Sequence, residues 1–125
     1  MMKSGWIVYK NKRILYADYS HFVADSEERR MEIVQINELV CHEPRGSVLL
    51  LVNVEGSTGT KEAVADLKDS AVKVKSSVVK TAVVGVTGFK AVLMKMIGSY
   101  SGLPMVPFND LEAAKEWLIK DVRDS

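Results

Sequence analysis

The feature that most constrains the fold is a short apolar run that leads straight into a loop of small and hydroxyl-bearing residues. Residues 48–54 are all Leu or Val apart from Asn53, and Gly46 and Gly56 bound the run too closely for a helix. Such a run without polar alternation is typical of a strand covered on both faces. The sequence therefore predicts a central strand here, followed by the loop 55–60 and then a helix.

The rest of the chain alternates β-rich runs with amphipathic stretches. The expected strands are 6–10, 13–19, 48–54, 80–86 and 105–108, with a hairpin turn at 11–12. The expected helices run from a cap at Asp25 to a stop at Pro44, from Thr60 to about Ser77, over 89–102, and onward from a capping box of Asn109 with Glu112. The order β-β-α-β-α-β-α-β-α predicts an α/β domain with a mostly parallel five-stranded sheet and an antiparallel first strand.

Apolar residues at helical spacing predict which face of each helix is buried. The expected buried residues of the first helix are Met31, Ile33, Val34, Ile36, Leu39 and Val40, with Cys41 as a small core residue. Those of the second are Val64, Leu67, Ala71, Val74 and Val78, and those of the last are Leu111, Ala114, Trp117, Leu118 and Val122.

Length and charge exclude several classes of protein. A chain of 125 residues fits a single domain over 1–125 that needs no disulfide or metal to fold. Seventeen Lys and Arg against sixteen Asp and Glu argue against a dedicated nucleic-acid binder. The single Cys41 favours a cytoplasmic protein, and no apolar run is long enough to span a membrane.

Ligands of open α/β sheets bind at the carboxyl ends of the parallel strands. The loops 20–25, 55–60, 86–88 and 109–110 are expected to share that edge of the sheet. Their candidate ligand-binding residues are His21, Phe22, Glu55, Gly56, Thr87, Gly88 and Asn109.

The loop 55–60 is the most informative of these. Its glycines and the hydroxyls of Ser57, Thr58 and Thr60 lie at the start of a helix, where backbone N–H groups favour an anion. Ser57 or Thr58 could instead accept a phosphoryl group. The alternative is a plain turn in which Gly59 supplies conformational freedom and Thr60 caps the helix. A P-loop is excluded because Thr60, not glycine, precedes Lys61.

Other motifs are better explained by structure than by chemistry. Gly85, Gly88 and Ala91 match a variant of the dinucleotide-binding loop, but they come late in the chain and close helix packing explains them, so no cofactor is expected. Cys41, His42 and Glu43 are adjacent on a helix and cannot all face one metal ion. Without a nucleophile, base and orienting residue, no catalytic residues are assigned and the protein is not expected to be an enzyme.

The order of elements, the hydroxyl loop before the second helix and the ending PFNDLEAAKEWLIKD resemble the STAS domain family. The likeness runs from about Trp6 to Asp121 and is greater to its small free-standing SpoIIAA-like branch of bacterial proteins. It implies a non-enzymatic domain that docks a kinase-like regulator, an anti-sigma factor, over the start of the second helix. Ser57-Thr58-Gly59 falls where antagonists carry their phosphorylated serine, which would make Ser57 the acceptor. Gly56 stands where they usually carry an acidic residue.

Two further interpretations stay open at this stage. The free-standing branch also resembles the lipid-binding CRAL-TRIO type of fold, which implies a carrier or sensor of a small amphipathic or anionic ligand, lipid-like or nucleotide, in a cleft at the carboxyl edge. Phe22, Phe89 and Tyr100 would line that cleft, or else belong to the core. The second interpretation is a homodimer that forms through the apolar residues 6–9. Alternatively, a helix of the same chain covers these residues.

Overall fold

Five strands form one sheet whose spatial order is the order along the chain. The computed structural model describes residues 4–21, 27–56, 61–85, 95, 102 and 105–120, without the side chains of 61, 63 and 64. Its strands are β1 (Gly5–Tyr9), β2 (Lys12–Asp18), β3 (Val48–Asn53), β4 (Val78–Val84) and β5 (Met105–Phe108). Its helices are α1 (Glu27–Cys41), α2 (Lys61–Val74) and α4 (Leu111–Ile119). The expected helix between β4 and β5 lies outside the described residues, apart from Lys95 and Gly102.

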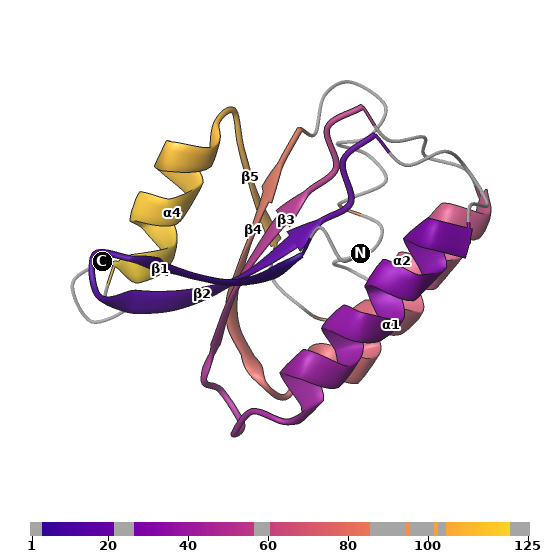
Figure 1. Cartoon of the computed structure of the whole chain (residues 1–125), viewed down its shortest axis with the longest axis horizontal. Coiled ribbons are helices and arrows are strands. Elements are labelled where there is room, and N and C mark those ends of the chain that lie inside the picture. The colour runs from indigo at the N-terminus through magenta and orange to yellow at the C-terminus, as the bar shows by residue number, and fades with distance from the viewer. Residues whose placement is uncertain are drawn as a thin grey trace.

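The predicted topology is confirmed. β1 is antiparallel to β2, and β2, β3, β4 and β5 are parallel to one another. Figure 1 shows α1 and α2 side by side on one face of the sheet and α4 on the other. Consecutive right-handed crossovers between neighbouring parallel strands place their helices on the same face, which accounts for the pairing of α1 with α2.

The hairpin turn lies one residue earlier than the sequence suggested. Lys10 and Asn11 have φ angles of 48° and 69°, and Tyr9 pairs with Lys12. Two consecutive positive φ angles are the signature of a type I′ turn, whose twist suits a two-residue hairpin. The register follows from the side chains, because it aligns Ile7 with Ile14 and Trp6 with Leu15.

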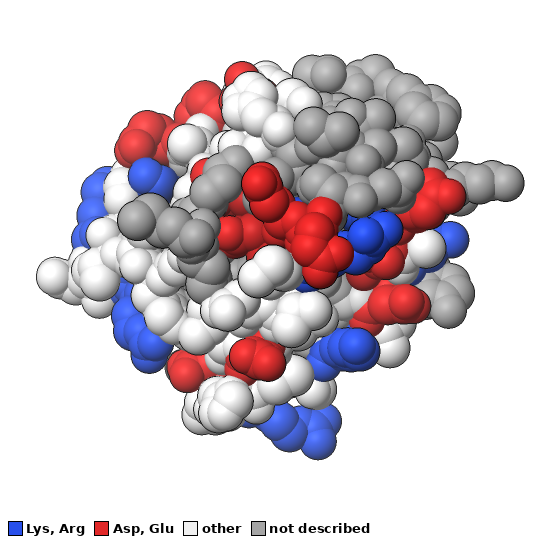
Figure 2. Space-filling view, turned by 45° about the vertical axis from the view of Figure 1, so that its right-hand side comes forward, with Lys and Arg blue, Asp and Glu red and all other residues white. Residues whose placement is uncertain are grey.

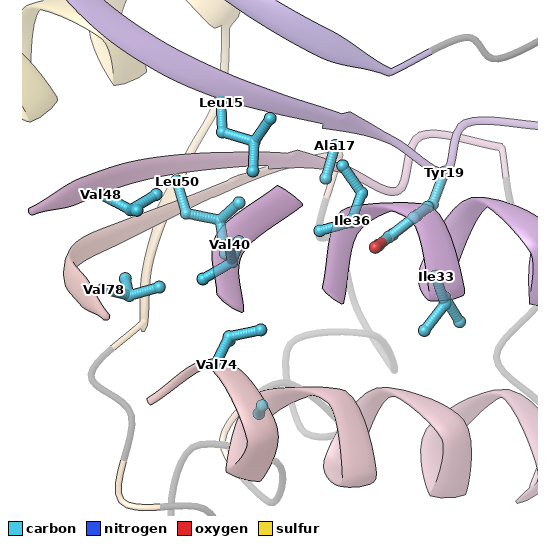
Figure 3. Packing of buried hydrophobic residues seen from close by; sticks show 11 residues of the cluster. Leu15, Ala17, Tyr19, Ile33, Ile36, Val40, Val48, Leu50, Val74 and Val78 are labelled. Atoms are coloured by element: carbon cyan, nitrogen blue, oxygen red, sulfur yellow. The ribbon is translucent and has the colours of Figure 1, made fainter. Parts of the chain in front are cut away.

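The first core fills the space between the sheet and the helices α1 and α2. Leu15, Leu50 and Val48 point from the strands toward Ile36 and Val40 of α1, as Figure 3 shows. The other members of this cluster are Ala17 and Val78 of the strands, Tyr19 after β2, Ile33 of α1, and Ala71 and Val74 of α2. Ile36 and Val40 are 1% and 0% exposed, so truncating either would leave a cavity.

The second core lies under α4. Ile14, Leu51 and Ala82 from three neighbouring strands meet Ala114 and Leu118 of the helix. Phe108 and Trp117 pack with ring centroids 5.5 Å apart. The amine of Lys80 donates to the carbonyls of Trp117 and Lys120, and that of Lys12 to Ile119, which satisfies the last carbonyls of α4 and complements its dipole.

The buried face of α1 differs from the predicted one. Met31 and Val34 are 59% and 54% exposed, whereas Arg29 and Glu32 are buried. The two charged residues can occupy the inner face because each has a partner there: Arg29 binds Asp66 of α2 at 2.9 Å, and Glu32 accepts a hydrogen bond from Ser4 at 2.6 Å. The spacing of hydrophobic residues alone cannot reveal that a charged residue is buried beside a polar partner.

Three smaller expectations are also corrected. Cys41 is exposed at the end of α1 and is no part of the core. α2 ends at Val74, so Val78 is buried as the first residue of β4, which begins and ends two residues earlier than predicted. The cap of α4 is Asp110, whose Oδ1 accepts from the backbone N–H of Ala113 at 2.7 Å, and not Asn109.

Candidate functional site

Backbone hydrogen bonds join the loop after β2 to the end of β3 and the loop that follows it, and join the loop after β3 to the end of β4. The N–H of Tyr19 donates to the carbonyl of Asn53, and the N–H of His21 donates to that of Glu55, both at 2.8 Å. Val54 donates in the same way to Val84 at 2.9 Å. The parallel ladder thus continues into the loops and holds them as one layer at the carboxyl edge of the sheet.

Gly56 lies directly beneath the imidazole of His21. Gly56 has a φ angle of 72°, and a Cβ built on it would lie 2.2 Å from Nδ1 of His21. His21 itself adopts a left-handed φ of 58°, and both residues are exposed. The turn therefore favours glycine at position 56 for two reasons, its positive φ angle and the space that the His21 ring occupies.

A second glycine closes the distance between the next two loops. Gly85 has a φ angle of 88°, and a Cβ there would lie 2.5 Å from the backbone nitrogen of Glu55. The glycine that opens the dinucleotide-like motif thus permits contact with a neighbouring loop. Gly88 and Ala91, the other residues of that motif, lie outside the described residues.

Two side chains fix the ends of the central strands. Buried Asn53 accepts from the N–H of Glu55 at 2.9 Å through Oδ1, and its amide donates to the hydroxyl of Tyr16 at 3.0 Å. Oδ1 of Asp18 accepts from both the N–H and the hydroxyl of Ser20, at 3.0 and 2.5 Å. Local bonds of this kind stabilise turns, so the loops leave the sheet in defined directions.

A buried polar chain links α1 to the end of β2. The hydroxyl of Ser4 donates to Glu32 and accepts from the backbone N–H of Asp18 at 2.8 Å. Burial, and then the negative charge of Glu32, raise the pKa of Tyr19 above its ordinary value. Burial is also the main reason that the pKa of Tyr16 is raised. Both phenols are therefore neutral near neutral pH, and the hydroxyl of Tyr16 accepts from Asn53.

The beginnings of α1 and α2 are held together at this same edge. The guanidinium of Arg29, whose side chain is 6% exposed, binds the carboxylate of Asp66 at 2.9 Å. Ser70 of α2 donates to Asn37 of α1 at 2.5 Å. Asp66 lies in the second turn of α2 and Ser70 in the third, so these two bonds hold α2 alongside α1.

Exposed carboxylates surround the start of the helices. Glu27 and Glu28 lie in the first turn of α1, Glu55 follows β3, and Glu62 lies in the first turn of α2; all four are exposed. Figure 2 shows acidic side chains gathered in the middle of this side of the molecule. Carboxylates are favourable at helix N-termini, and together they make the edge attractive to a cationic surface.

The structure brings together three of the residues expected at this edge, His21, Glu55 and Gly56. Asn109 is exposed at the end of β5. The remaining candidates lie outside the described residues: Phe22, Ser57, Thr58, Gly59, Thr60, Thr87 and Gly88.

Sequence reasoning missed the positioning residues of the edge. Asn53 is the one polar residue of the run 48–54 and was a visible signal. No sequence signal pointed to the roles of Asp18 and Glu32, because each role depends on a partner distant in sequence or on the loop conformation.

The described residues contain no group of three or more His, Cys, Asp or Glu side chains placed to bind a metal ion. Among the described helices, none has an apolar stretch of the length that a bilayer crossing requires.

Comparison with known proteins identifies the fold. No protein-family model matches the chain, and no curated protein matches it. Among solved structures, it is similar to an uncharacterised protein of the DUF3478 family, with a SpoIIAA-like fold, from Shewanella loihica PV-4. That likeness has a TM-score of 0.72 at 13% sequence identity and covers 92% of this chain and 91% of the other. The protein therefore has a SpoIIAA-like fold.

Proposed function

We propose that the protein is a non-enzymatic regulatory domain that binds a protein partner over the start of α2, with phosphorylation at Ser57 or Thr58 controlling the affinity. The observation that carries this proposal is the exposed turn Glu55–Gly56, which His21 and Asn53 hold and which four residues separate from the start of α2. The residues 57–60 that join the two are outside the described part, but both of their attachment points are fixed. The SpoIIAA-like fold suggests an interaction domain of the STAS type.

The form of the edge favours a macromolecular partner over a small enclosed ligand. In the described part of the chain, the ring of His21 rests on Gly56 and the backbone of Glu55 rests on Gly85. The first residues after β2, β3 and β4 are thus in close contact with one another at these positions. A layer of abutting loops offers a surface for docking, whereas small-molecule sites are concave.

The charge at this edge indicates the chemistry of the partner. Four exposed glutamates, at positions 27, 28, 55 and 62, flank the start of α1 and α2. Arg30 offsets one of them through a contact of 3.8 Å with Glu27. We expect the partner to present Lys or Arg here, because complementary potentials speed encounter and select the binding orientation.

A phosphate on Ser57 or Thr58 would change this surface strongly. It adds about 1.5–2 negative charges in a loop that Glu55 and Glu62 already flank. If the loop becomes buried in the complex, the added charge must lose its hydration, which is costly unless a new cation pairs with it. We therefore expect phosphorylation to weaken binding.

The experiment is affinity capture from cells with the tagged wild-type chain, followed by titration of the captured protein against variants. Ser57→Asp, Thr58→Asp and Gly59→Arg, singly and together, should weaken binding by about tenfold or more, equivalent to at least about 1.4 kcal/mol. Arg45→Glu, at an exposed site on the amino edge of the sheet, is the matched control and should bind as the wild type does. Binding unchanged in the triple variant would refute the proposal.

A separate measurement addresses the rival function of a small-ligand carrier. Native mass spectrometry of protein purified from cells should give the mass of the unmodified or phosphorylated chain. A stoichiometric extra mass that disappears on denaturation would favour the carrier instead.

A further inference from the structure

Among the described residues, the outer edge of the sheet is formed by β1, which pairs with β2 on one side and with no strand on the other. Its sequence, Gly-Trp-Ile-Val-Tyr, contains no charged residue and no proline, and its register with β2 has no bulge. Proteins usually protect a free strand edge with one of these features, because an open edge pairs readily with another strand. β1 has none of the three within its length.

The hairpin determines which backbone groups of β1 face outward. In a two-residue hairpin with a type I′ turn, the residues next to the turn, Tyr9 and Lys12, exchange hydrogen bonds. Hydrogen bonding then alternates along an antiparallel pair, so Ile7 and Gly5 also face β2. The N–H and C=O groups of Trp6 and Val8 therefore point away from the sheet.

The side chains of the same two residues lie on the face that carries α1 and α2. Val8 is 72% exposed, more than any other large hydrophobic residue in the described part of the chain. Trp6 is partly buried against the first core, and the guanidinium of Arg13 lies 3.9 Å from its ring centre. An exposed valine thus stands beside a tryptophan on an unprotected edge.

We propose that two copies of this chain pair through β1, antiparallel to each other about a two-fold axis at Ile7. This register places Trp6 opposite the partner's Val8 and Val8 opposite the partner's Trp6. The outward backbone groups of both residues then face one another, as hydrogen-bonded pairs require. The two sheets continue into one of ten strands.

A second copy fits this edge better than an unrelated strand because the edge is complementary to itself. Under the two-fold axis each exposed Val8 packs beside a partner's indole, so the same pair forms twice. The start of α2 stays free, so this dimer is independent of the proposed docking function.

The first test is the mass of the chain in solution by sedimentation equilibrium. The wild type should approach twice the chain mass of 13.9 kDa at concentrations up to about 0.1 mM. Val8→Lys adds a charge at the edge and should raise the dimer dissociation constant at least tenfold, whereas Val72→Lys, at a site 52% exposed on α2, should not change it. A monomeric wild type, or a Val8→Lys variant that dimerises equally well, would overturn the proposal.

A second variant tests the register and does not depend on weakening the dimer. In a Cys41→Ser background, Ile7→Cys places two thiols on the proposed two-fold axis in a non-hydrogen-bonded pair, where Cα atoms approach to about 4.5 Å, a separation that a disulfide can span. Mild oxidation should give a covalent dimer, while Val72→Cys in the same background should give none. A dimer that does not cross-link through Ile7→Cys would overturn the β1 register.

Discussion

Gly56 and Gly85 are the two residues on which the shape of the carboxyl edge depends most directly. Both have positive φ angles, but different neighbours occupy the space where a side chain would lie. At Gly56 the neighbour is the ring of His21, which is exposed and can rotate away. At Gly85 it is the backbone of Glu55, which the Val54–Val84 hydrogen bond holds in place.

The two glycines should therefore respond differently to alanine. Gly56→Ala is expected to lower the free energy of unfolding by about 1 kcal/mol, chiefly through the strained φ angle. Gly85→Ala should cost about 2–4 kcal/mol, because the clash with a fixed backbone adds to that strain. Urea unfolding of both variants tests the order. Equal losses would mean that the loops after β3 and β4 do not abut.

Tyr19 gives the protein a specific sensitivity to alkaline pH. Its folded pKa lies above the 10.0 of a free tyrosine because burial and then Glu32 disfavour the phenolate. The raised pKa means that the folded state is favoured while Tyr19 is protonated. Its contribution to the free energy of unfolding is fully present below pH 10.0. It falls as pH rises further, since the tyrosine of the unfolded chain releases its phenolic proton first.

The test compares the pH dependence of stability in Tyr19→Phe and the wild type. The unfolding free energy of the wild type should fall between about pH 10 and pH 11, and that of Tyr19→Phe should fall less steeply, by the contribution of one proton. Tyr16 and Tyr9 also have raised pKa values and contribute to the slope that remains. Identical slopes would show that Tyr19 is not buried as described.

At the scale of elements, α1 shows where sequence reasoning succeeds and where it ends. The order of strands and helices followed from the spacing of apolar runs and short connections, and the structure confirms it for the five strands and the three helices that it describes. The inner face of α1 did not follow, because Arg29 and Glu32 are buried through partners that no local pattern reveals. The contact of His21 with Gly56 was equally out of reach, since it joins two loops and requires a histidine with positive φ.

Truncation of α1 residues distinguishes the observed inner face from the predicted one. Ile36→Ala removes a side chain that is 1% exposed and should cost about 2–5 kcal/mol. Val34→Ala, at a site 54% exposed, should change stability by no more than about 0.5 kcal/mol. Chemical denaturation of the Ile36→Ala and Val34→Ala variants measures both changes in unfolding free energy. A large loss at Val34 would indicate that α1 is rotated about its axis.

The ion pair between Arg29 of α1 and Asp66 of α2 can be tested by comparing the loss of one partner with the loss of both. Asp66→Asn leaves the buried guanidinium of Arg29 without its carboxylate and should destabilise the protein by about 1–3 kcal/mol. Adding Arg29→Met should cost less than the sum of the two single changes, because the buried charge is then gone. Strict additivity in urea unfolding would show that the two residues do not interact.

At the scale of the whole molecule, the two faces of the sheet and its edges have separable roles. α1 and α2 cover one face and α4 the other, so both faces are used for stability. In the part of the chain that the structure describes, β1 has no strand on its outer side, and the carboxyl edge carries exposed carboxylates around the start of α2. Binding to a regulatory partner at the carboxyl edge and pairing of copies through β1 therefore place no competing demands on the same residues.

The central claim is that a protein partner covers the edge around the start of α2. The most direct measurement is hydrogen–deuterium exchange of the chain, alone and in complex with the captured partner. The proposal predicts that peptides spanning residues 55–66 become protected on binding while those spanning 42–47, at the amino edge, do not change. Protection confined to other parts of the chain, with 55–66 exchanging as in the free protein, would contradict it.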